Sequence, residues 1–160
     1  MNKKIPIITL GALLLAALLV APALSHHSFA MYDQSKTVTL TGAMKQFVAQ
    51  ANHAELHFYL LQPDRKGIAK TPDGKYVEWG VEMAGAAAVA QQGITTATFP
   101  VGTVFSVKLN PLRDGSNFGS RTGALARCPM DPATKKPVLP AADKHCDSVP
   151  GNTLSGGTTF

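Results

Sequence analysis

Alternation of hydrophobic and polar residues is the feature of this sequence that most limits its fold. The pattern occurs in four segments, 38–48, 55–60, 77–83 and 104–109. A period of two is typical of strands that bury one face, because successive side chains of a strand point to opposite faces of a sheet. Residues 122–127 alternate less clearly and are predicted to form a fifth strand. The chain is therefore predicted to be mainly β.

Signals between these segments suggest how the strands connect. Asn52 and the Asp-Gly pairs at 73–74 and 114–115 predict turns, and an Ala-rich stretch, 84–92, followed by Gly93 predicts a short helix. Gly42 interrupts the first segment and indicates a bulge or a tight coil there. Three strands, one short helix and two further strands are the order of a five-stranded OB-like β-barrel, predicted here over residues 26–127.

The first 25 residues have the three parts of a secretory signal peptide. Lys3 and Lys4 precede an apolar run, 5–20, and a small-residue exit, 21–25. The alternative is a membrane anchor, which needs about 20 predominantly apolar residues. Pro6 and Gly11 weaken the run, so we expect a periplasmic or secreted protein with no stable membrane anchor after cleavage.

Two cleavage sites satisfy the small-residue rule, and both leave a histidine close to a new α-amine. Cleavage after Ser25 makes His26 the first residue, whereas cleavage after Ala23 makes it the third. A first-position histidine offers its amine and its ring to one metal ion. A third-position histidine adds two backbone amides in a square-planar set that suits Cu(II) or Ni(II). Either cleavage site therefore leaves an N-terminus that can chelate a metal ion.

Charge and cysteine content restrict the remaining possibilities. The net charge of +5 falls to +3 without Lys3 and Lys4, which is too weak to indicate a nucleic-acid partner. Cys128 and Cys146 are an even pair in an exported chain, so a disulfide is expected. Their wide spacing and export disfavour a pair of thiolate metal ligands. Residues 128–160 are rich in Pro and Gly and are predicted to form an irregular tail, loose after the disulfide.

Several short motifs resemble a family of small exported bacterial proteins of unknown function. They are His26-His27-Ser28-Phe29, Thr41-Gly42, Asn52-His53, Val77-Glu78-Trp79 and Pro111-Leu112-Arg113-Asp114-Gly115. Members of that family typically begin the mature chain with His-His-Ser-Phe and carry an Asn-Pro-His motif. This chain lacks the proline of that motif. The resemblance implies export but no activity, so a function has to be argued from the residues.

The histidines are the best candidates for a metal site. Either His53 or His57 can join such a site but not both, because four strand residues separate their Cα atoms by about 13 Å. The predicted ligands are the amine and ring of His26 together with His53 or His27, and copper is the favoured metal. The ordinary interpretation is that these histidines are solvated or lie on a polar strand face.

Two classes of function fit this pattern. The first is a metal-binding carrier or accessory protein with a copper ion and an envelope protein as its partners. The second is a metal-free periplasmic module that binds a ligand or a protein, with Tyr59 and Tyr76 as stacking platforms and Lys75 and Lys108 as charges. Trp79 shares its parity with core positions and is expected to fill the core. The sequence has no Ser-His-Asp spacing, phosphate-binding loop or dinucleotide motif, so an enzyme is the weaker expectation.

Overall fold

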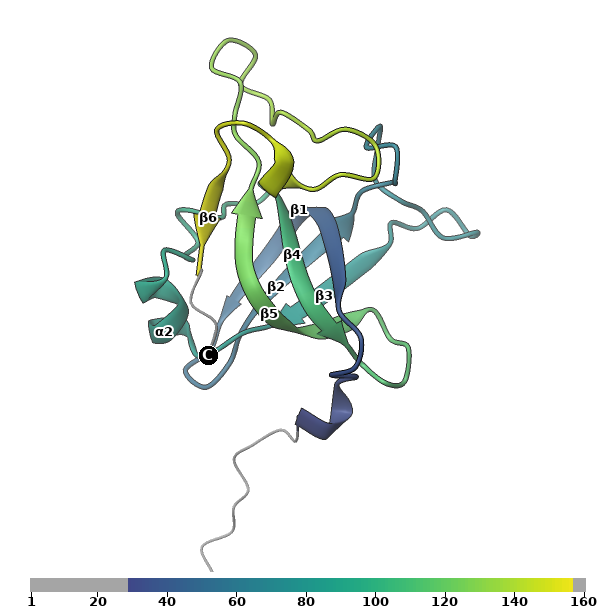
Figure 1. The fold of residues 1–160 in the computed structure, drawn as a ribbon, viewed down its shortest axis with the longest axis vertical. Coiled ribbons are helices and arrows are strands. Elements are labelled where there is room, and N and C mark those ends of the chain that lie inside the picture. Colours follow the sequence, from purple (N-terminus) through teal and green to yellow (C-terminus); the bar gives the residue numbers. More distant parts are fainter. Residues whose placement is uncertain (1–28, 157–160) are drawn as a thin grey trace, which may run out of the picture.

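The computed structural model describes residues 29–156, and the predicted leader with His26 and His27 lies outside this range. A short 3₁₀ turn, η1 (Phe29–Met31), leads into the first strand. The strands are β1 (Val38–Ala49), β2 (Ala54–Leu60), β3 (Glu78–Glu82), β4 (Val104–Pro111), β5 (Phe118–Arg127) and β6 (Thr153–Ser155). Figure 1 shows them wrapped around one core, with β6 beside β5.

The first five strands close into a barrel. Their order is β3-β2-β1-β4-β5, and β3 pairs in parallel with β5 to complete the circle. The predicted all-β, OB-like barrel is thus confirmed, although β5 begins at Phe118 and not at residue 122. In the described range, no helix is long and apolar enough to cross a membrane.

One short helix, α2 (Ala86–Gln91), lies between β3 and β4 as the Ala-rich stretch predicts. Its end is a Schellman motif. Gly93 has a φ of +77° and donates its N–H to Ala90, while Ile94 donates to the carbonyl oxygen of Val89. The glycine ends the helix because the left-handed conformation carries no steric cost there.

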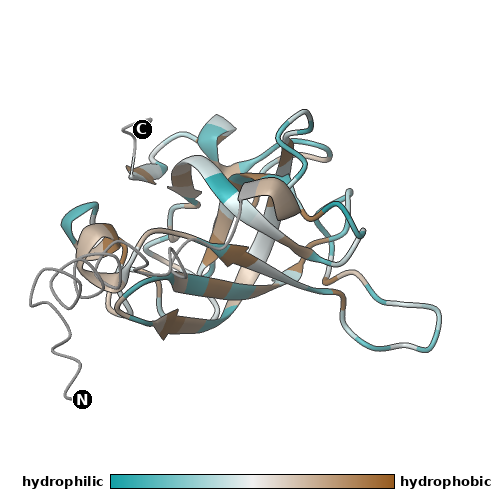
Figure 2. Ribbon diagram, turned by 90° about the horizontal axis from the view of Figure 1, so that it is seen from below, coloured by the Kyte–Doolittle hydropathy of each residue, from teal (hydrophilic) through white to brown (hydrophobic). Residues whose placement is uncertain are grey.

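Hydrophobic side chains from all five strands fill the barrel. Phe105 contacts Phe58 and Phe99 edge to face, with ring centroids 5.2 and 5.9 Å apart. Trp79 packs against the same cluster, as its parity predicts. Figure 2 shows the hydrophobic and hydrophilic residues alternating along the strands. The buried members of this core are Met44, Ala54, Leu56, Phe58, Val81, Met83, Val89, Ile94, Phe99, Phe105, Val107, Leu109 and Leu125.

β1 contains a bulge, but not at the glycine that suggested one. The register with β2 shifts between Met44 and Gln46, which leaves Lys45 as the extra residue. The bulge inverts the alternation that follows it, so that Phe47 packs against the core, whereas unbroken alternation from Val38 would place Val48 there. Gly42 has a different role, because it allows β2 to approach β1 closely.

The tail packs on the outside of the barrel and forms a second hydrophobic cluster with β4 and β5. The predicted disulfide between Cys128 and Cys146 is present, and both cysteines belong to this cluster. The short turn η2 (Cys146–Ser148) follows, and β6 then pairs with β5. The expectation of a loose tail after the disulfide is therefore wrong for the described residues. The cluster consists of Leu61, Val104, Ala126, Cys128, Cys146 and Val149.

We predict that Gly42→Ala lowers the free energy of unfolding by about 1–3 kcal/mol, the usual cost of overpacking. A Cβ atom at this position would lie 2.6 Å from the carbonyl oxygen of Tyr59 and would overlap the ring of Phe58. Gly123→Ala in β5 is the matched control, because no atom lies within 4 Å of its added Cβ. Urea denaturation measures both variants, and equal stabilities for the two would contradict the prediction.

Candidate functional site

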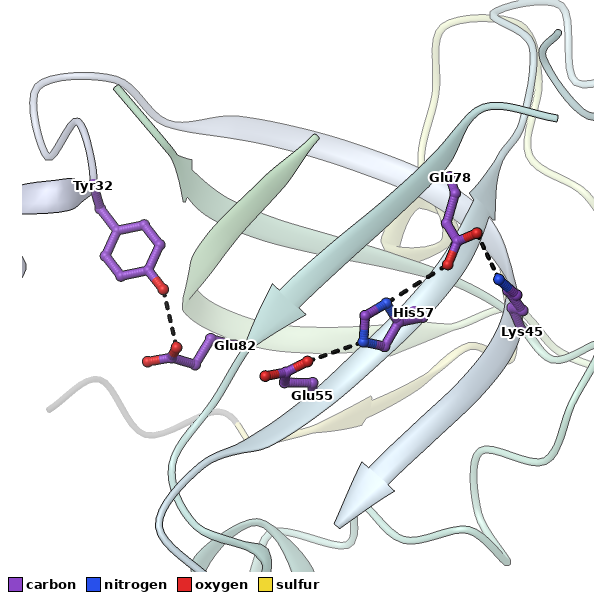
Figure 3. Close-up of polar contacts among 6 residues, drawn as sticks. All are labelled: Tyr32, Lys45, Glu55, His57, Glu78 and Glu82. Atoms are coloured by element: carbon purple, nitrogen blue, oxygen red, sulfur yellow. Dashed lines mark hydrogen bonds and ion pairs between the residues drawn. The ribbon is translucent and has the colours of Figure 1, made fainter. Parts of the chain in front are cut away.

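Polar side chains form a row on the outer face of β2 and β3. In β2, Glu55 and His57 alternate with the buried Leu56 and Phe58, so both polar residues point away from the core. In β3, Glu78 and Glu82 occupy the same outer face. The pairing register places Glu55 opposite Glu82 and His57 opposite Gly80. The row thus gathers three carboxylates and one imidazole on two neighbouring strands (Figure 3).

Glu82 is the residue of this row on which two other segments converge. Tyr32 donates its hydroxyl hydrogen to Oε2 of Glu82 over 3.1 Å. At the other oxygen, Nδ1 of His53 lies 3.3 Å from Oε1. His53 directly precedes β2, and Tyr32 belongs to the segment before β1. One carboxylate therefore joins the beginning of the described chain to the turn between β1 and β2.

Tyr32 is fixed in this position by more than its hydroxyl group. Its side chain is only 2% exposed, and its backbone forms a β-bridge with Leu112. The next residue, Asp33, donates its N–H to the carbonyl oxygen of Pro111, and Arg113 donates to the carbonyl oxygen of Ala30 over 3.0 Å. These contacts hold residues 30–33 against the edge of the barrel where Glu82 lies.

A second group of contacts occupies the other end of the row. Nε2 of His57 lies 2.9 Å from Oε2 of Glu55, and its Nδ1 lies 3.7 Å from Oε1 of Glu78. Lys45, the bulged residue of β1, donates to Oε2 of Glu78 over 2.6 Å. This bond raises the pKa of Lys45. His57 and Lys45 thus contact Glu55 and Glu78, whereas Tyr32 and His53 contact Glu82.

Glu82 lies opposite a second carboxylate and beside a phenol. Like charges directly opposite each other on neighbouring strands are destabilising, and Glu55 faces Glu82 in this way. The pKa of Tyr32 is raised above its usual value, chiefly by burial and further by the charge of Glu82 and the hydrogen bond to it. A neutral phenol, and not a phenolate, therefore donates to the carboxylate at neutral pH.

The structure describes only one of the three predicted histidine ligands. His26 and His27 lie outside the described residues, whereas His53 is placed beside Glu82. His57 contacts Glu55 and Glu78 instead. Among residues 29–156, no group of three or more His, Cys, Asp or Glu side chains is arranged to hold a metal ion by itself.

The sequence reasoning missed Glu82 and Tyr32. Glu82 shares its parity with Glu78 on the polar face of a predicted strand, which is a usable signal. Tyr32 carries no comparable signal, because only the folded chain brings it to β3, 50 residues away in sequence.

Comparison with known proteins identifies a family for this chain. The model of a family described as a family of unknown function, DUF6152, matches residues 14–122. The chain belongs to this family. No curated protein and no solved structure gave a match. The matched range contains Tyr32, His53 and Glu82, and it ends before the two cysteines of the tail.

We predict that Tyr32→Phe lowers the free energy of unfolding by about 1.5–3 kcal/mol at pH 7, because it removes a hydrogen bond to a charged acceptor. The variant also changes how the free energy of unfolding depends on pH under alkaline conditions. The pKa of Tyr32 is higher in the folded than in the unfolded chain, so the unfolded chain loses its proton first. The stability of the native sequence therefore falls as the pH rises above about 10, the ordinary tyrosine value.

Urea denaturation between pH 7 and 11 measures this difference. In Tyr32→Phe the alkaline fall is smaller than in the native sequence. Tyr76→Phe is the matched control, because Tyr76 is 52% exposed and its loss leaves the fall in place. Parallel profiles for the native chain and Tyr32→Phe would contradict the assignment.

Proposed function

We propose that this chain is an exported metal-binding protein that holds a divalent ion, copper in the first instance, between its processed N-terminus and the His53–Glu82 pair. The observation that carries the proposal is the convergence of Tyr32 and His53 on one carboxylate. It brings the segment that follows the predicted cleavage site to the one predicted histidine ligand that the structure describes.

The length of the chain permits this site. His27 precedes Tyr32 by five residues, which span at most about 18 Å when fully extended. Tyr32 itself lies at Glu82. A free amine and a ring from His26, the imidazole of His53 and a carboxylate oxygen of Glu82 form a mixed nitrogen and oxygen set. Such sets suit the tetragonal geometry of Cu(II).

The proposal accounts for the incomplete donor set in the described residues. His53 and Glu82 supply two donors, whereas a tightly held ion needs more. Export and cleavage would supply the missing nitrogens, so metal binding would depend on processing. The disulfide supports export, because such bonds persist in oxidising compartments. The protein would then carry copper or assist an envelope enzyme.

A second candidate function has an observation of its own. Tyr76 is half exposed and lies against Tyr59, with ring centroids 5.3 Å apart, and Lys70 lies 5.5 Å from the centre of the Tyr76 ring. An exposed aromatic pair with a cation is a suitable platform for a saccharide or another planar ligand. This surface would function without a metal.

We predict that the exported protein, its N-terminus first fixed by mass spectrometry, binds Cu(II) with a visible d–d band. His53→Ala weakens binding about tenfold or more by isothermal titration, because it removes one of the few donors. His57→Ala is the matched control and leaves the affinity within about twofold, because His57 belongs to the other end of the row.

The decisive comparison adds three residues other than histidine ahead of the mature N-terminus, so that for either cleavage site neither His26 nor His27 is the first or third residue. This extension destroys the spacing between the amine and the first imidazole, and it should abolish the d–d band while the fold stays intact. Unchanged affinity in the extended chain would overturn the proposal. A chain that binds no copper but retains a saccharide through Tyr76 would support the second candidate.

A further inference from the structure

Three consecutive tail residues, 144–146, are attached to the barrel by three different groups. We call these residues the tail clasp. The carbonyl oxygen of Lys144 accepts two hydrogen bonds from the guanidinium of Arg65, over 3.0 and 2.5 Å. Nδ1 of His145 lies 2.7 Å from Oγ1 of Thr41. The N–H of Cys146 donates to Oγ of Ser106 over 2.8 Å, and its sulfur forms the disulfide.

The clasp ends in a hydroxyl pair that is sealed from solvent. Thr41 of β1 and Ser106 of β4 are direct cross-strand partners, with their hydroxyl oxygens 2.7 Å apart. Their side chains face the second hydrophobic cluster, and the residues are only 1% and 3% exposed. Each hydroxyl proton therefore has to find an acceptor within this network, because an unpaired buried donor costs the full desolvation penalty.

This requirement fixes the direction of the hydrogen bonds. Ser106 already accepts from Cys146, and it can donate to Thr41. Thr41 then donates to His145, whose Nδ1 has to be an unprotonated acceptor. Every donor is satisfied only in this order. The neutral imidazole with its proton on Nε2 is the form that the network selects.

A second proton on His145 would reverse the order. Nδ1–H would donate to Thr41, and Thr41 would turn its own proton toward Ser106. Ser106 would then accept two hydrogen bonds, while its proton would have no acceptor among the described residues. The charged imidazole is thus incompatible with the closed network for a geometric reason.

The surroundings of His145 also favour its neutral form. Burial lowers the pKa of His145, and the nearby Arg65 lowers it further, whereas Asp147 of η2 opposes them. Arg65 is only 8% exposed and is held by Lys144 and by the carbonyl oxygen of Gln62, so it cannot turn away from the imidazole. Thr41 and Ser106, the contacts from β1 and β4, carry no charge.

We propose that the tail clasp is a proton-sensitive latch that opens when His145 takes up a proton. Opening detaches His145 from Thr41, while the disulfide keeps Cys146 at the end of β5. The loop between the cysteines then moves away from the barrel at its Lys144 end and uncovers part of the second hydrophobic cluster. Because the histidine is more easily protonated in the open form, acidification shifts the equilibrium toward opening.

Amide hydrogen exchange from pH 7.5 to pH 5, corrected for the intrinsic exchange rate, tests the latch. The reporters are the amides of Asp143, which donates to Pro63, and of Cys146. Their protection is expected to fall about fivefold on acidification, the equivalent of one lost hydrogen bond. The amide of Leu60, which pairs with Val77 in the barrel, is the internal reference and keeps its protection.

Two variants separate the latch from general acid destabilisation. His145→Asn supplies an acceptor that does not titrate, so both reporters should stay protected across the pH range. Thr41→Val keeps the shape of the buried side chain but removes the hydroxyl, so protection should already be low at pH 7.5 and should change little. An equal acid-induced loss in the native chain and His145→Asn, or no loss in the native chain, would overturn the proposal.

Discussion

Closure of the barrel between β3 and β5 is the contact on which the rest of the structure depends. The contact is short, with three pairs of residues from Gly80 and Phe118 to Glu82 and Ser120. A side chain at Gly80 would collide with the ring of Phe118, so the absence of a Cβ atom lets the aromatic ring lie across the join. Val81, which lies between Gly80 and Glu82 in β3, is fully buried. Without the closure, the polar row of β3 would have no fixed relation to the segment that carries Tyr32.

The candidate site follows from strand register and not from a local motif. The pairing of β2 with β3 places Glu55 directly opposite Glu82. Two like charges in this position destabilise the pairing of the strands. Lys45 contacts Glu78 and His57 contacts Glu55, whereas Tyr32 and His53 contact Glu82. Lys45 can contact Glu78 because it is the bulged residue of β1. The bulge and the acidic row are therefore parts of one arrangement.

The sequence predicted the elements that depend on neighbouring residues. Alternation located four strands within a few residues, and the Asp-Gly pairs located two turns in which Gly74 and Gly115 have a positive φ. The start of β5 escaped detection because Gly119 and Ser120 interrupt the hydrophobic pattern. β6 escaped because three residues are too few for a period of two to be visible. The bulge at Lys45 lay only three residues from the predicted one, but it inverted every inward position after it.

The contacts of the candidate site and of the clasp could not be predicted in this way, because they join segments that no periodicity relates. Tyr32 meets Glu82 across 50 residues, and Thr41 meets His145 across 104. Each contact uses a polar group on the outer face of a strand whose other face lies in the core, so the hydrophobic pattern fixes where the group points and leaves its partner undetermined.

The two ends of the described chain supply partners to these polar groups in different environments. The N-terminal segment brings a phenol to a half-buried, charged row, whereas the tail brings an imidazole to a sealed pair of hydroxyls. In the first environment several polar and charged side chains contact the carboxylates. In the second, a single proton determines whether every hydrogen bond can be made. His53 and His145 are both half-buried, so the groups that surround each imidazole, and not its exposure, underlie the different roles proposed for them.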